Sequence, residues 1–195
     1  MSGECGVAVP AVPNLAATDW IEGVLVRPLE PIADLRGSLC EIHRDGWGLA
    51  PRPVQWDFIT TKARVLRGTH VHRLRYDYLI VVQGRATFGL ADLRRRSPTF
   101  RQSMVIEAAG DSPEVVIVPP GVAHGIFAHE TMIYLYGLTH PYDGNDQMGC
   151  RYDDATLGIN WPDKDPVLLP RDLNLPDFET LLREFEAAGG VPAGL

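Results

Sequence analysis

Apolar positions along the chain fall into many short runs separated by turn-forming residues. The run YDYLIVVQG, at 76–84, is rich in β-branched and aromatic residues, and in GRATFGLADL, at 84–93, apolar positions largely alternate. Such runs are typical of β-strands, and the Gln-Gly pair between them predicts a hairpin. Further runs of the same kind predict strands at 21–29, 37–44, 54–70, 103–108, 114–121 and 131–140.

A helical pattern occurs near the C-terminal end. In DFETLLREFEAAGG, Asp177 is a candidate N-cap and Gly189 ends the pattern. Between them, Leu181, Leu182 and Phe185 fall on one face. Many short strands, punctuated by 19 glycines and 16 prolines, are thus followed by one short helix. This order predicts an all-β jelly-roll barrel with a short C-terminal helix, an architecture that holds small molecules in its mouth.

Length and composition fit one globular domain. The chain has 195 residues, of which 45% are hydrophobic and 22% charged, enough for a single core. We divide it into a flexible leader at 1–20, a barrel domain at 21–176, and the helix with its tail at 177–195. The leader lacks the basic start of a signal peptide, and no run approaches the ~20 apolar residues of a membrane helix. We therefore expect a cytoplasmic protein with no membrane partner.

Charge and cysteine usage narrow the function classes further. The formal net charge of −7 disfavours nucleic acid as a partner, although a local basic pocket for a small anion remains compatible with it. Cys5, Cys40 and Cys150 are widely spaced, which is typical of unpaired thiols in a reducing compartment. They predict neither a disulfide framework nor a zinc site.

Candidate chemistry begins in RGTHVHRLRYDYLIVVQG, at 67–84. Residues two apart on a strand face the same side, so His70 and His72 are both expected to face the barrel interior. With Asp77, and with His124 of PPGVAHGIF, they form a set similar to the metal-binding pattern of cupins. Imidazoles and a carboxylate suit Zn, Fe, Mn or Ni. A metal-dependent cupin is therefore one interpretation of this segment.

A longer set of segments points to a different cupin family. The segments are DLRGSLCEI, QWDFITTKARVLRGTH, VVQGRATFGLADLRRRSPTF, VPPGVAHGIF, YLYGLTHPY and GCRYDDATLGINWP. Between about Val24 and Pro176 they follow the order and spacing of the dTDP-4-dehydrorhamnose 3,5-epimerase family, which they resemble. The resemblance implies a cupin-type double-stranded β-helix without a cofactor. It also implies an isomerase that inverts C3, C5 or both in a nucleotide-linked 4-keto-6-deoxyhexose.

The resemblance assigns roles to individual residues. It makes His70 the base, paired with Asp172 of LLPRD, because an aspartate on one imidazole nitrogen raises the basicity of the other. It makes Tyr136 the acid, with Tyr134 as the rival if the register differs by two. The residues implied to bind substrate are Arg36 and Arg67 at the diphosphate, Glu41, Gln55 and Asp57 at the nucleotide, and His124 and Asp77 near the sugar.

The sequence departs from the family pattern around the sugar and the base. Asp77 stands where the family has a lysine that stabilises the enolate oxygen, which leaves Arg73 and Arg75 as nearby candidates for the cation. The remaining replacements are Pro141 beside Tyr142, where a family tyrosine stacks on thymine, Asp57 for an asparagine, and Ile59 and Thr61 for serines. We therefore expect a divergent member, acting on another nucleotide-linked hexulose or at one carbon only.

Alternative functions fit parts of the same pattern. Nucleotide-sugar 3,4-ketoisomerases share an R-G-x-H-x-H segment, which His72 fits, but they usually lack the extension DDATLGINWP. A metal-dependent cupin would use His70, His72, Asp77 and His124. A non-catalytic sugar-binding cupin is compatible with the missing lysine, because fold alone does not fix function.

The resemblance also implies a homodimer. In the family, an N-terminal strand completes the sheet of the partner. The segment GVLVRPL, at 23–29, suits such strand addition. We therefore expect a nucleotide-diphospho-sugar and a second copy of the chain as the partners.

Overall fold

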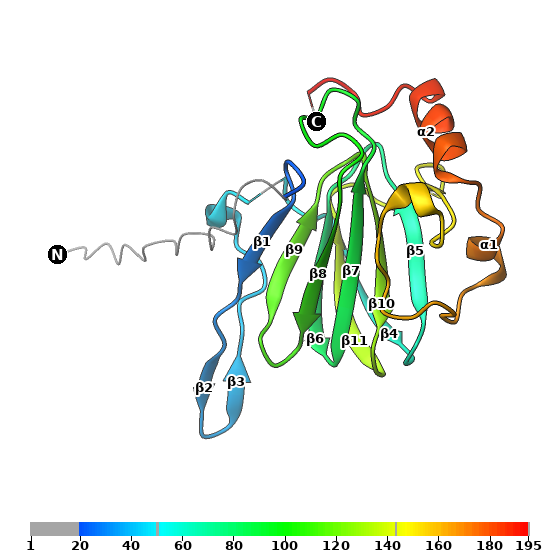
Figure 1. Cartoon of the computed structure of the whole chain (residues 1–195). Helices are drawn as coiled ribbons and strands as arrows, with labels where there is room; N and C mark the ends of the chain where they lie inside the picture. The colour runs from blue at the N-terminus through cyan, green and yellow to red at the C-terminus, as the bar shows by residue number, and fades with distance from the viewer. Residues whose placement is uncertain (1–19, 50, 143, 195) are drawn as a thin grey trace.

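The computed structural model describes residues 20–49, 51–142 and 144–194, and in them two five-stranded sheets pack together (Figure 1). The predicted leader lies outside the described residues, apart from Trp20. The all-β jelly-roll prediction is confirmed. In spatial order, the first sheet is β1 (Leu25–Pro28), β9 (Glu114–Val118), β6 (Asp77–Gln83), β11 (Met132–Leu138) and β4 (Gln55–Thr61). The second is β12 (Met148–Gly149), β5 (Leu66–Val71), β10 (Val122–Ala128), β7 (Arg85–Asp92) and β8 (Ser103–Ala109).

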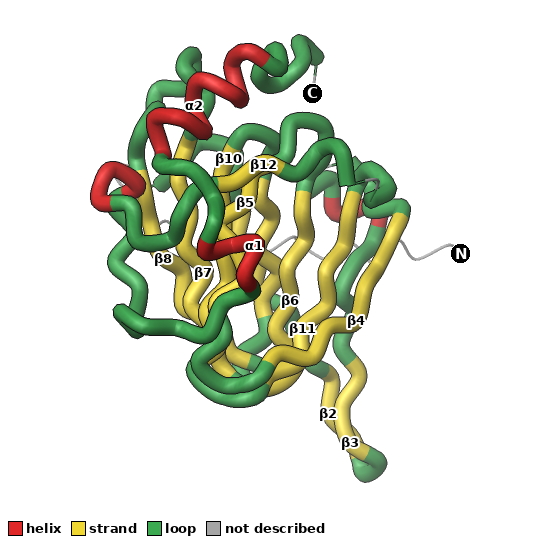
Figure 2. The backbone as a smooth tube through the Cα atoms, turned by 90° about the vertical axis from the view of Figure 1, so that its right-hand side faces the viewer, coloured by secondary structure: helices red, strands yellow, loops and turns green. Residues whose placement is uncertain are grey.

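Short elements surround the two sheets. The hairpin of β2 (Ile32–Asp34) and β3 (Gly37–Leu39) projects beyond the barrel (Figure 1). The helical elements are η1 (Asp45–Trp47), η2 (Ala155–Leu157), α1 (Pro170–Leu173) and α2 (Phe178–Ala187). Helix α1 contacts β5, and α2 contacts β12 and η2 (Figure 2). In the described ranges, no helix has the length and apolar character needed to cross a bilayer.

The segment predicted as a hairpin, β6 followed by β7, instead crosses from one sheet to the other. Strand β6 pairs with β9 and β11, whereas β7 pairs with β8 and β10. Gly84 joins them with a φ of 81°, and a Cβ at this position would lie 2.9 Å from the Cβ of Met132. The hairpin prediction is wrong because apolar periodicity identifies strands without identifying the strands they pair with.

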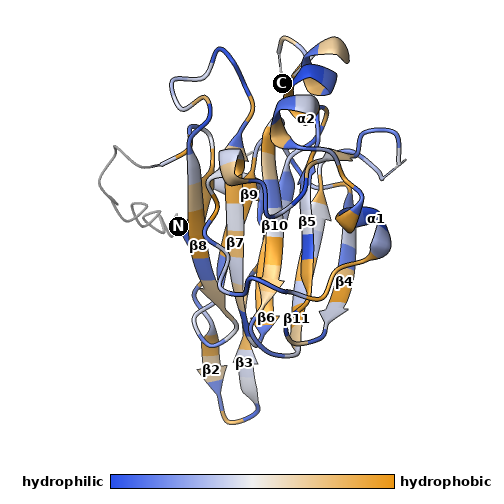
Figure 3. Ribbon diagram, turned by 45° about the vertical axis from the view of Figure 1, so that its right-hand side comes forward, coloured by the Kyte–Doolittle hydropathy of each residue, from blue (hydrophilic) through white to orange (hydrophobic). Residues whose placement is uncertain are grey.

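The main core lies between the sheets. Apolar positions concentrate on the strands and hydrophilic ones on the connections (Figure 3). Burying each large apolar side chain contributes about 1.5–3 kcal/mol. Members of this core from both sheets include Leu79, Val81, Phe88, Leu90, Val116, Ile126 and Met132.

The predicted C-terminal helix is confirmed in its start, its buried face and its end. The Asp177 carboxylate accepts a hydrogen bond from the Thr180 backbone N–H at 2.7 Å, which caps α2. The predicted apolar residues are buried in a cluster that includes Val71 of β5. Gly189 follows the helix with a φ of 94°. The list of buried α2 residues is Phe178, Leu181, Leu182 and Phe185.

The N-terminal strand takes its place in the sheet of its own chain. Strand β1 pairs antiparallel with β9, from Leu25 opposite Ile117 to Pro28 opposite Glu114. The segment expected to complete a partner's sheet is therefore already paired within the chain. The element that extends away from the barrel is the β2–β3 hairpin that follows it (Figure 1).

Candidate active site

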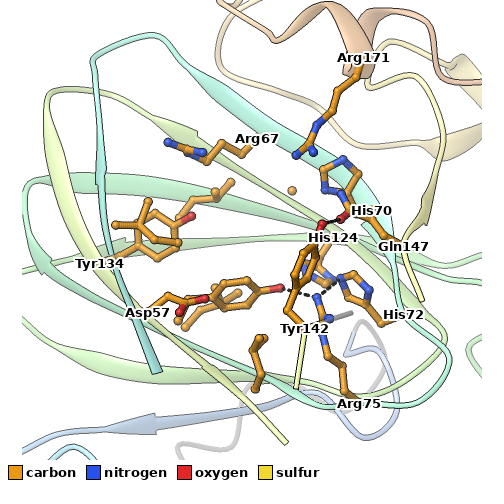
Figure 4. A pocket seen from close by; sticks show the side chains of 16 residues that line it. Asp57, Arg67, His70, His72, Arg75, His124, Tyr134, Tyr142, Gln147 and Arg171 are labelled. Carbon is orange, nitrogen blue, oxygen red and sulfur yellow. Dashed lines mark hydrogen bonds between the residues drawn. The ribbon is translucent and has the colours of Figure 1, made fainter. Parts of the chain in front are cut away.

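A cavity of about 280 Å³ lies between the two sheets, with polar side chains contributed from both (Figure 4). Strands β4 and β11 supply one side, and β5 and β10 supply the other. The polar lining residues are Asp57, Arg67, His70, His72, Arg75, His124, Tyr134, Tyr136, Tyr142, Gln147 and Arg171. The cavity thus collects five of the ten residues predicted to bind or transform a substrate, which are His70, Tyr136, Asp57, Arg67 and His124.

The predicted pair of His70 and Asp172 is brought together on one wall. His70 lies on β5 and Asp172 on α1, with His70 Nε2 3.0 Å from Asp172 Oδ1. Asp172 is 3% exposed, whereas the His70 side chain keeps 16% of its surface exposed. Because Nε2 donates to the carboxylate, Nδ1 carries the lone pair and is the nitrogen able to accept a proton.

Close packing of β5 against β10 positions this wall. Gly68 has a φ of 127°, and a Cβ there would lie 2.6 Å from Cα of Gly125 and 2.8 Å from the carbonyl oxygen of His124. Only glycine fits such a close approach without moving a strand. Two residues further along, His70 lies directly opposite His124 in the ladder. Gly68 therefore sets how closely the strands carrying these two histidines approach each other.

A buried polar cluster centred on Asp77 forms the other part of the site. Asp77 begins β6 and is 1% exposed. Its Oδ1 accepts a hydrogen bond from Arg75 Nε at 2.9 Å, and its Oδ2 accepts one from the Tyr136 hydroxyl at 2.9 Å. The same Oδ2 lies 3.1 Å from His124 Nε2. Asp77 does not line the cavity, but each of these partners does.

Burial and charge together set the pKa values in this cluster. Burial by itself raises the pKa of Asp77, but His72, His124 and Arg75 outweigh it and lower the pKa to about 2. Burial lowers the pKa of His72 to about 4, despite the opposing charge of Asp77. Burial, and then Asp77, raise the pKa of Tyr136 well above its usual value of 10.0. At neutral pH the cluster therefore contains an ionised Asp77, a neutral His72 and a protonated Tyr136.

Hydrogen bonds occupy both ring nitrogens of His72. Nδ1 donates to the backbone carbonyl of Asp146, since a carbonyl oxygen only accepts. Nε2 therefore lacks a hydrogen, and it accepts one from Arg75 Nη2 at 2.9 Å. The sequence prediction that His70 and His72 share a face is confirmed, since both line the cavity. Only His70, however, has a ring nitrogen left for proton transfer.

Three residues of the proposed metal set come together. His72, Asp77 and His124 offer ligand atoms within 4.8 Å of one another, whereas His70 is bonded to Asp172 instead. Arg75 already donates to Asp77 Oδ1 and to His72 Nε2. A divalent ion among these atoms would lie against a guanidinium that is always charged. The geometry therefore favours Arg75 over a metal as the positive group here.

The structure also separates the two candidate cations near Asp77. Arg75 lines the cavity, and only 5% of its side chain is exposed. Arg73 points elsewhere, because its Nε donates to the backbone carbonyl of Gly190 at 2.9 Å in the C-terminal segment. Of the two arginines considered in the sequence, only Arg75 faces the site.

Of the residues predicted to bind the nucleotide diphosphate, some lie at the cavity and others lie away from it. Asp57 and Arg67 line the cavity, and Gln55 lies behind the lining. Gln55 Nε2 donates to the Asp57 carboxylate at 3.1 Å, and Gln55 Oε1 accepts from the Tyr142 backbone N–H at 3.0 Å. Gln55 therefore holds two lining residues in place.

Arg36 and Glu41 lie away from the cavity of their own chain. Arg36 is in the turn between β2 and β3, paired with Asp34, and its side chain is 89% exposed. Glu41 follows the hairpin and pairs with Arg44. Neither lines the cavity. The sequence places them in a family motif, but the structure does not bring them to this site.

Arg171 and Gln147 line the cavity although the sequence pattern does not single them out. Arg171 immediately precedes Asp172, and its Nε lies 3.5 Å from Asp172 Oδ1. A basic residue beside the predicted aspartate was the available signal for it. Gln147 accepts a hydrogen bond from the Tyr142 hydroxyl at 3.4 Å. It lies in a loop without periodicity, so the sequence offers no signal for it.

Known proteins are similar to this chain both in sequence and in fold. Residues 18–180 match the family model described as dTDP-4-dehydrorhamnose 3,5-epimerase. The spore coat polysaccharide biosynthesis protein SpsL of Bacillus subtilis is 31% identical over 145 residues, which cover 72% of this chain and 96% of SpsL. The dTDP-4-dehydrorhamnose 3,5-epimerase of Escherichia coli is 27% identical over 180 residues, which cover 87% of this chain and 97% of that one.

A solved structure extends the similarity to three dimensions. NovW, a 4-keto-6-deoxy sugar epimerase from Streptomyces spheroides, superposes with a TM-score of 0.77 at 27% identity, covering 89% of this chain and 90% of NovW. The family match includes the strands that carry His70 and Tyr136 as well as Asp172 on α1. The chain therefore belongs to the dTDP-4-dehydrorhamnose 3,5-epimerase family.

Proposed function

We propose that the protein inverts a carbon beside the ketone of a dTDP-linked 4-keto-6-deoxyhexose, at C3, C5 or both. The observation that carries this proposal is a candidate base and a candidate acid on facing sheets around one cavity. His70 belongs to the sheet of β5 and β10, and Tyr136 to the sheet of β6 and β11. Inversion requires proton removal on one face of a carbon and proton delivery on the other. The names of the family and of NovW support the substrate class.

His70 acts as the base in this proposal. Its Nδ1 removes the proton from the carbon next to the carbonyl, and the electron pair of that C–H bond forms the enolate. Asp172 accepts the Nε2–H at 3.0 Å and stabilises the imidazolium that results. The partial exposure of His70 leaves the ring accessible to a bound sugar.

Tyr136 acts as the acid on the opposite face. Burial keeps its pKa well above 10.0, so the phenol holds its proton at neutral pH and can donate it to the enolate carbon. Arg75 Nη2 lies 3.4 Å from the phenolic oxygen. This guanidinium stabilises the phenolate that remains after the transfer.

The cations at the other side of the cavity suit the diphosphate. Figure 4 shows Arg67 and Arg171 on the same side as His70, away from Arg75 and His72. Guanidinium groups bind phosphate oxygens through paired donors. Tyr142 is half exposed, its backbone N–H is held by Gln55, and its ring lies 5.9 Å from the Arg75 guanidinium, so it covers the Arg75 side of the site.

We also propose that two copies form a dimer in the cytoplasm, with each hairpin reaching the cavity of the other copy. This arrangement gives Arg36 and Glu41 a role that they lack in their own chain. The exposed apolar surface supports it, because surfaces of this kind mark contact sites. The exposed apolar residues are Ile32, Leu35 and Leu39 on the hairpin and Trp56 and Phe58 on β4.

Light scattering after gel filtration tests the dimer. We expect a mass of twice 21.5 kDa for the wild-type protein. Replacing Leu35 with Glu should shift it toward the monomer and lower substrate affinity, whereas the matched change of Val105 to Glu, on β8, should do neither. A monomeric wild-type protein with full activity would contradict the exchange of hairpins.

The ketoisomerase alternative is less compatible with the site. The feature that favours it in the sequence is His72, and both ring nitrogens of His72 are engaged, by Asp146 and by Arg75. The two reactions also differ in their products. An epimerase leaves the carbonyl in place, whereas a ketoisomerase moves it.

Proton exchange in deuterium oxide tests the proposed reaction. The protein is incubated with dTDP-4-keto-6-deoxyglucose, and the C3–H and C5–H signals are followed by NMR. We expect deuterium at each inverted carbon together with a new epimer. Tyr136→Phe should keep the exchange that His70 catalyses but lose the epimer by about 100-fold or more.

The control for that variant is Tyr134→Phe, which changes a cavity-lining tyrosine two residues away and should leave epimer formation within a few-fold. If Tyr134→Phe abolishes the epimer instead, the acid is Tyr134. A product with a displaced carbonyl would support the ketoisomerase, and the absence of exchange by the wild-type protein would contradict the proposed function.

A further inference from the structure

Abstraction of a proton beside a carbonyl places negative charge on the carbonyl oxygen, and the site needs a positive group there. Among the described residues that line the cavity, the permanently charged ones are Arg67, Arg75 and Arg171. Arg67 is held by Thr61, its Nε donating to the hydroxyl at 3.0 Å, and Arg171 is largely exposed. Figure 4 shows both on the side opposite Arg75. Arg75 is the buried member of the three.

The contacts of Arg75 fix its orientation and leave one nitrogen for a ligand. Nε donates to Asp77, and Nη2 contacts His72 Nε2 and the Tyr136 hydroxyl. Nη1 has no hydrogen-bond partner among the described residues, and it carries two of the five guanidinium N–H donors. Since Arg75 lines the cavity beside Tyr136, a ligand oxygen that receives this donor lies next to the acid.

Asp77 positions the guanidinium from behind. It is buried, accepts from Arg75 and Tyr136, and does not line the cavity, whereas Arg75 does. The charge that faces a substrate is therefore the guanidinium, although a carboxylate lies one layer deeper. His72 assists, because its Nε2 is the lone-pair nitrogen that receives the Arg75 donor.

We propose that Arg75 is the residue that binds the enolate oxygen, held in place by Asp77 and His72. This inference rests on the proposed function and deepens it. As His70 removes the proton, charge develops on the carbonyl oxygen, and Arg75 Nη1 donates to that oxygen. When Tyr136 returns a proton to carbon, the electron pair moves back and the carbonyl is restored. No oxidant or metal takes part, and the atoms of the sugar are conserved.

The test separates this role from a structural one. Arg75→Gln alone leaves the buried Asp77 without its guanidinium partner and is prone to misfold, so the informative variant is Arg75→Gln with Asp77→Asn, which removes both charges. We expect its thermal midpoint to stay close to the wild-type value and its kcat for deuterium exchange to fall by about 100- to 1,000-fold. Its Kd for dTDP, measured by calorimetry, should stay within a few-fold, because Arg75 binds the sugar ketone and not the diphosphate.

Returning a cation to the same place should restore part of the rate. We expect Arg75→Lys, and the swap of Arg75→Gln with Asp77→Lys, to exchange deuterium faster than the neutral double variant. As a matched control, Arg73→Gln should leave kcat near the wild-type value, because Arg73 points to Gly190. A neutral double variant that keeps the wild-type kcat would overturn the assignment of Arg75.

Two further outcomes are distinguishable. If the wild-type protein exchanges no deuterium at C3 or C5 although it binds dTDP, the proposed function fails and the role of Arg75 fails with it. If a chelator abolishes exchange and a divalent metal restores it, a metal supplies the positive charge and Arg75 does not. Retention of exchange in the chelator, with loss in the neutral double variant, supports Arg75.

Discussion

The two walls of the cavity are built in opposite ways. On one wall, His70 has Asp172 as its one hydrogen-bond partner among the described residues, and it keeps part of its surface exposed. On the other, Asp77 is buried beneath Arg75 and Tyr136, and every oxygen of its carboxylate is hydrogen-bonded. A base has to be reached by its substrate, whereas a buried charge has to be paired before it can be buried at all. Function and stability should therefore separate on the His70 wall and be linked on the Asp77 wall.

Replacing His70 with Ala should abolish proton abstraction at the His70 wall without unfolding the protein. Loss of the base removes proton abstraction, which contributes about 10²- to 10⁴-fold in rate, so deuterium exchange should fall by that factor. The unfolding free energy from urea denaturation should fall by about 1–3 kcal/mol, because the buried Asp172 loses a hydrogen-bond donor but keeps Arg171 Nε at 3.5 Å. The matched control is His140→Ala, an exposed histidine outside the cavity lining. Rapid exchange by the His70 variant would assign the base elsewhere.

Replacing Asp77 with Ala should show the opposite behaviour and destabilise the fold. It leaves the Arg75 guanidinium buried without its carboxylate, which typically costs about 3–5 kcal/mol of unfolding free energy. The surface pair of Arg64 and Asp163 is the control, since Asp163→Ala should cost at most about 1 kcal/mol. Urea denaturation at pH 7 measures both. Equal effects of the two changes would mean that the Asp77 wall is no more coupled to stability than the surface.

The same wall should make stability depend on pH. Burial lowers the pKa of His72 from 6.5 to about 4. Between these pH values, His72 is protonated in the unfolded chain but neutral in the folded protein. Stability should fall by about 3 kcal/mol as the pH decreases from about 6.5 to about 4. The lowered pKa of Asp77, from 3.8 to about 2, extends the loss to lower pH.

Urea denaturation between pH 4 and pH 8 checks this expectation. The variant His72→Gln should lose most of the slope between pH 6.5 and pH 4, because an amide does not titrate there. The exposed His140→Gln should retain it. A slope that persists unchanged in the His72 variant would place the titrating group elsewhere.

How well the sequence predicts each wall depends on how far apart along the chain its interacting residues are. Strands, the capped helix and the shared face of His70 and His72 depend on local periodicity, and all three are confirmed. The pairing of His70 with Asp172 joins residues 102 positions apart, and only the family motif indicated it. Local pattern alone also failed for β6 and β7, whose hairpin would have been local but which lie in different sheets.

The arrangement of the Asp77 cluster could not be predicted from the sequence, for a physical reason. The replacement of a lysine by Asp77 is visible in the chain, but its consequence depends on which nearby arginine turns inward. Arg73 and Arg75 are two residues apart, and only the fold shows that one bonds Gly190 while the other bonds Asp77. Likewise, Arg36 belongs to one of the family motifs, yet it lies on the projecting hairpin. A sequence motif does not indicate whether its residues contribute to the cavity of their own chain or to that of a second copy.

Replacing Asp172 with Asn on the His70 wall should have the smallest effect on the rate of deuterium exchange. In Asp172→Asn, the amide oxygen can still accept the Nε2–H, so the ring keeps its position, but the charge that stabilises the imidazolium is lost. We expect deuterium exchange to slow by about 10- to 100-fold, with little change in unfolding free energy. The neighbouring change Arg171→Gln, the control, should weaken dTDP binding and leave the rate at saturation intact. A loss as large as that of His70→Ala would mean that Asp172 fixes the tautomer of the ring, because an amide turned with its NH₂ toward Nε2 would force the hydrogen onto Nδ1.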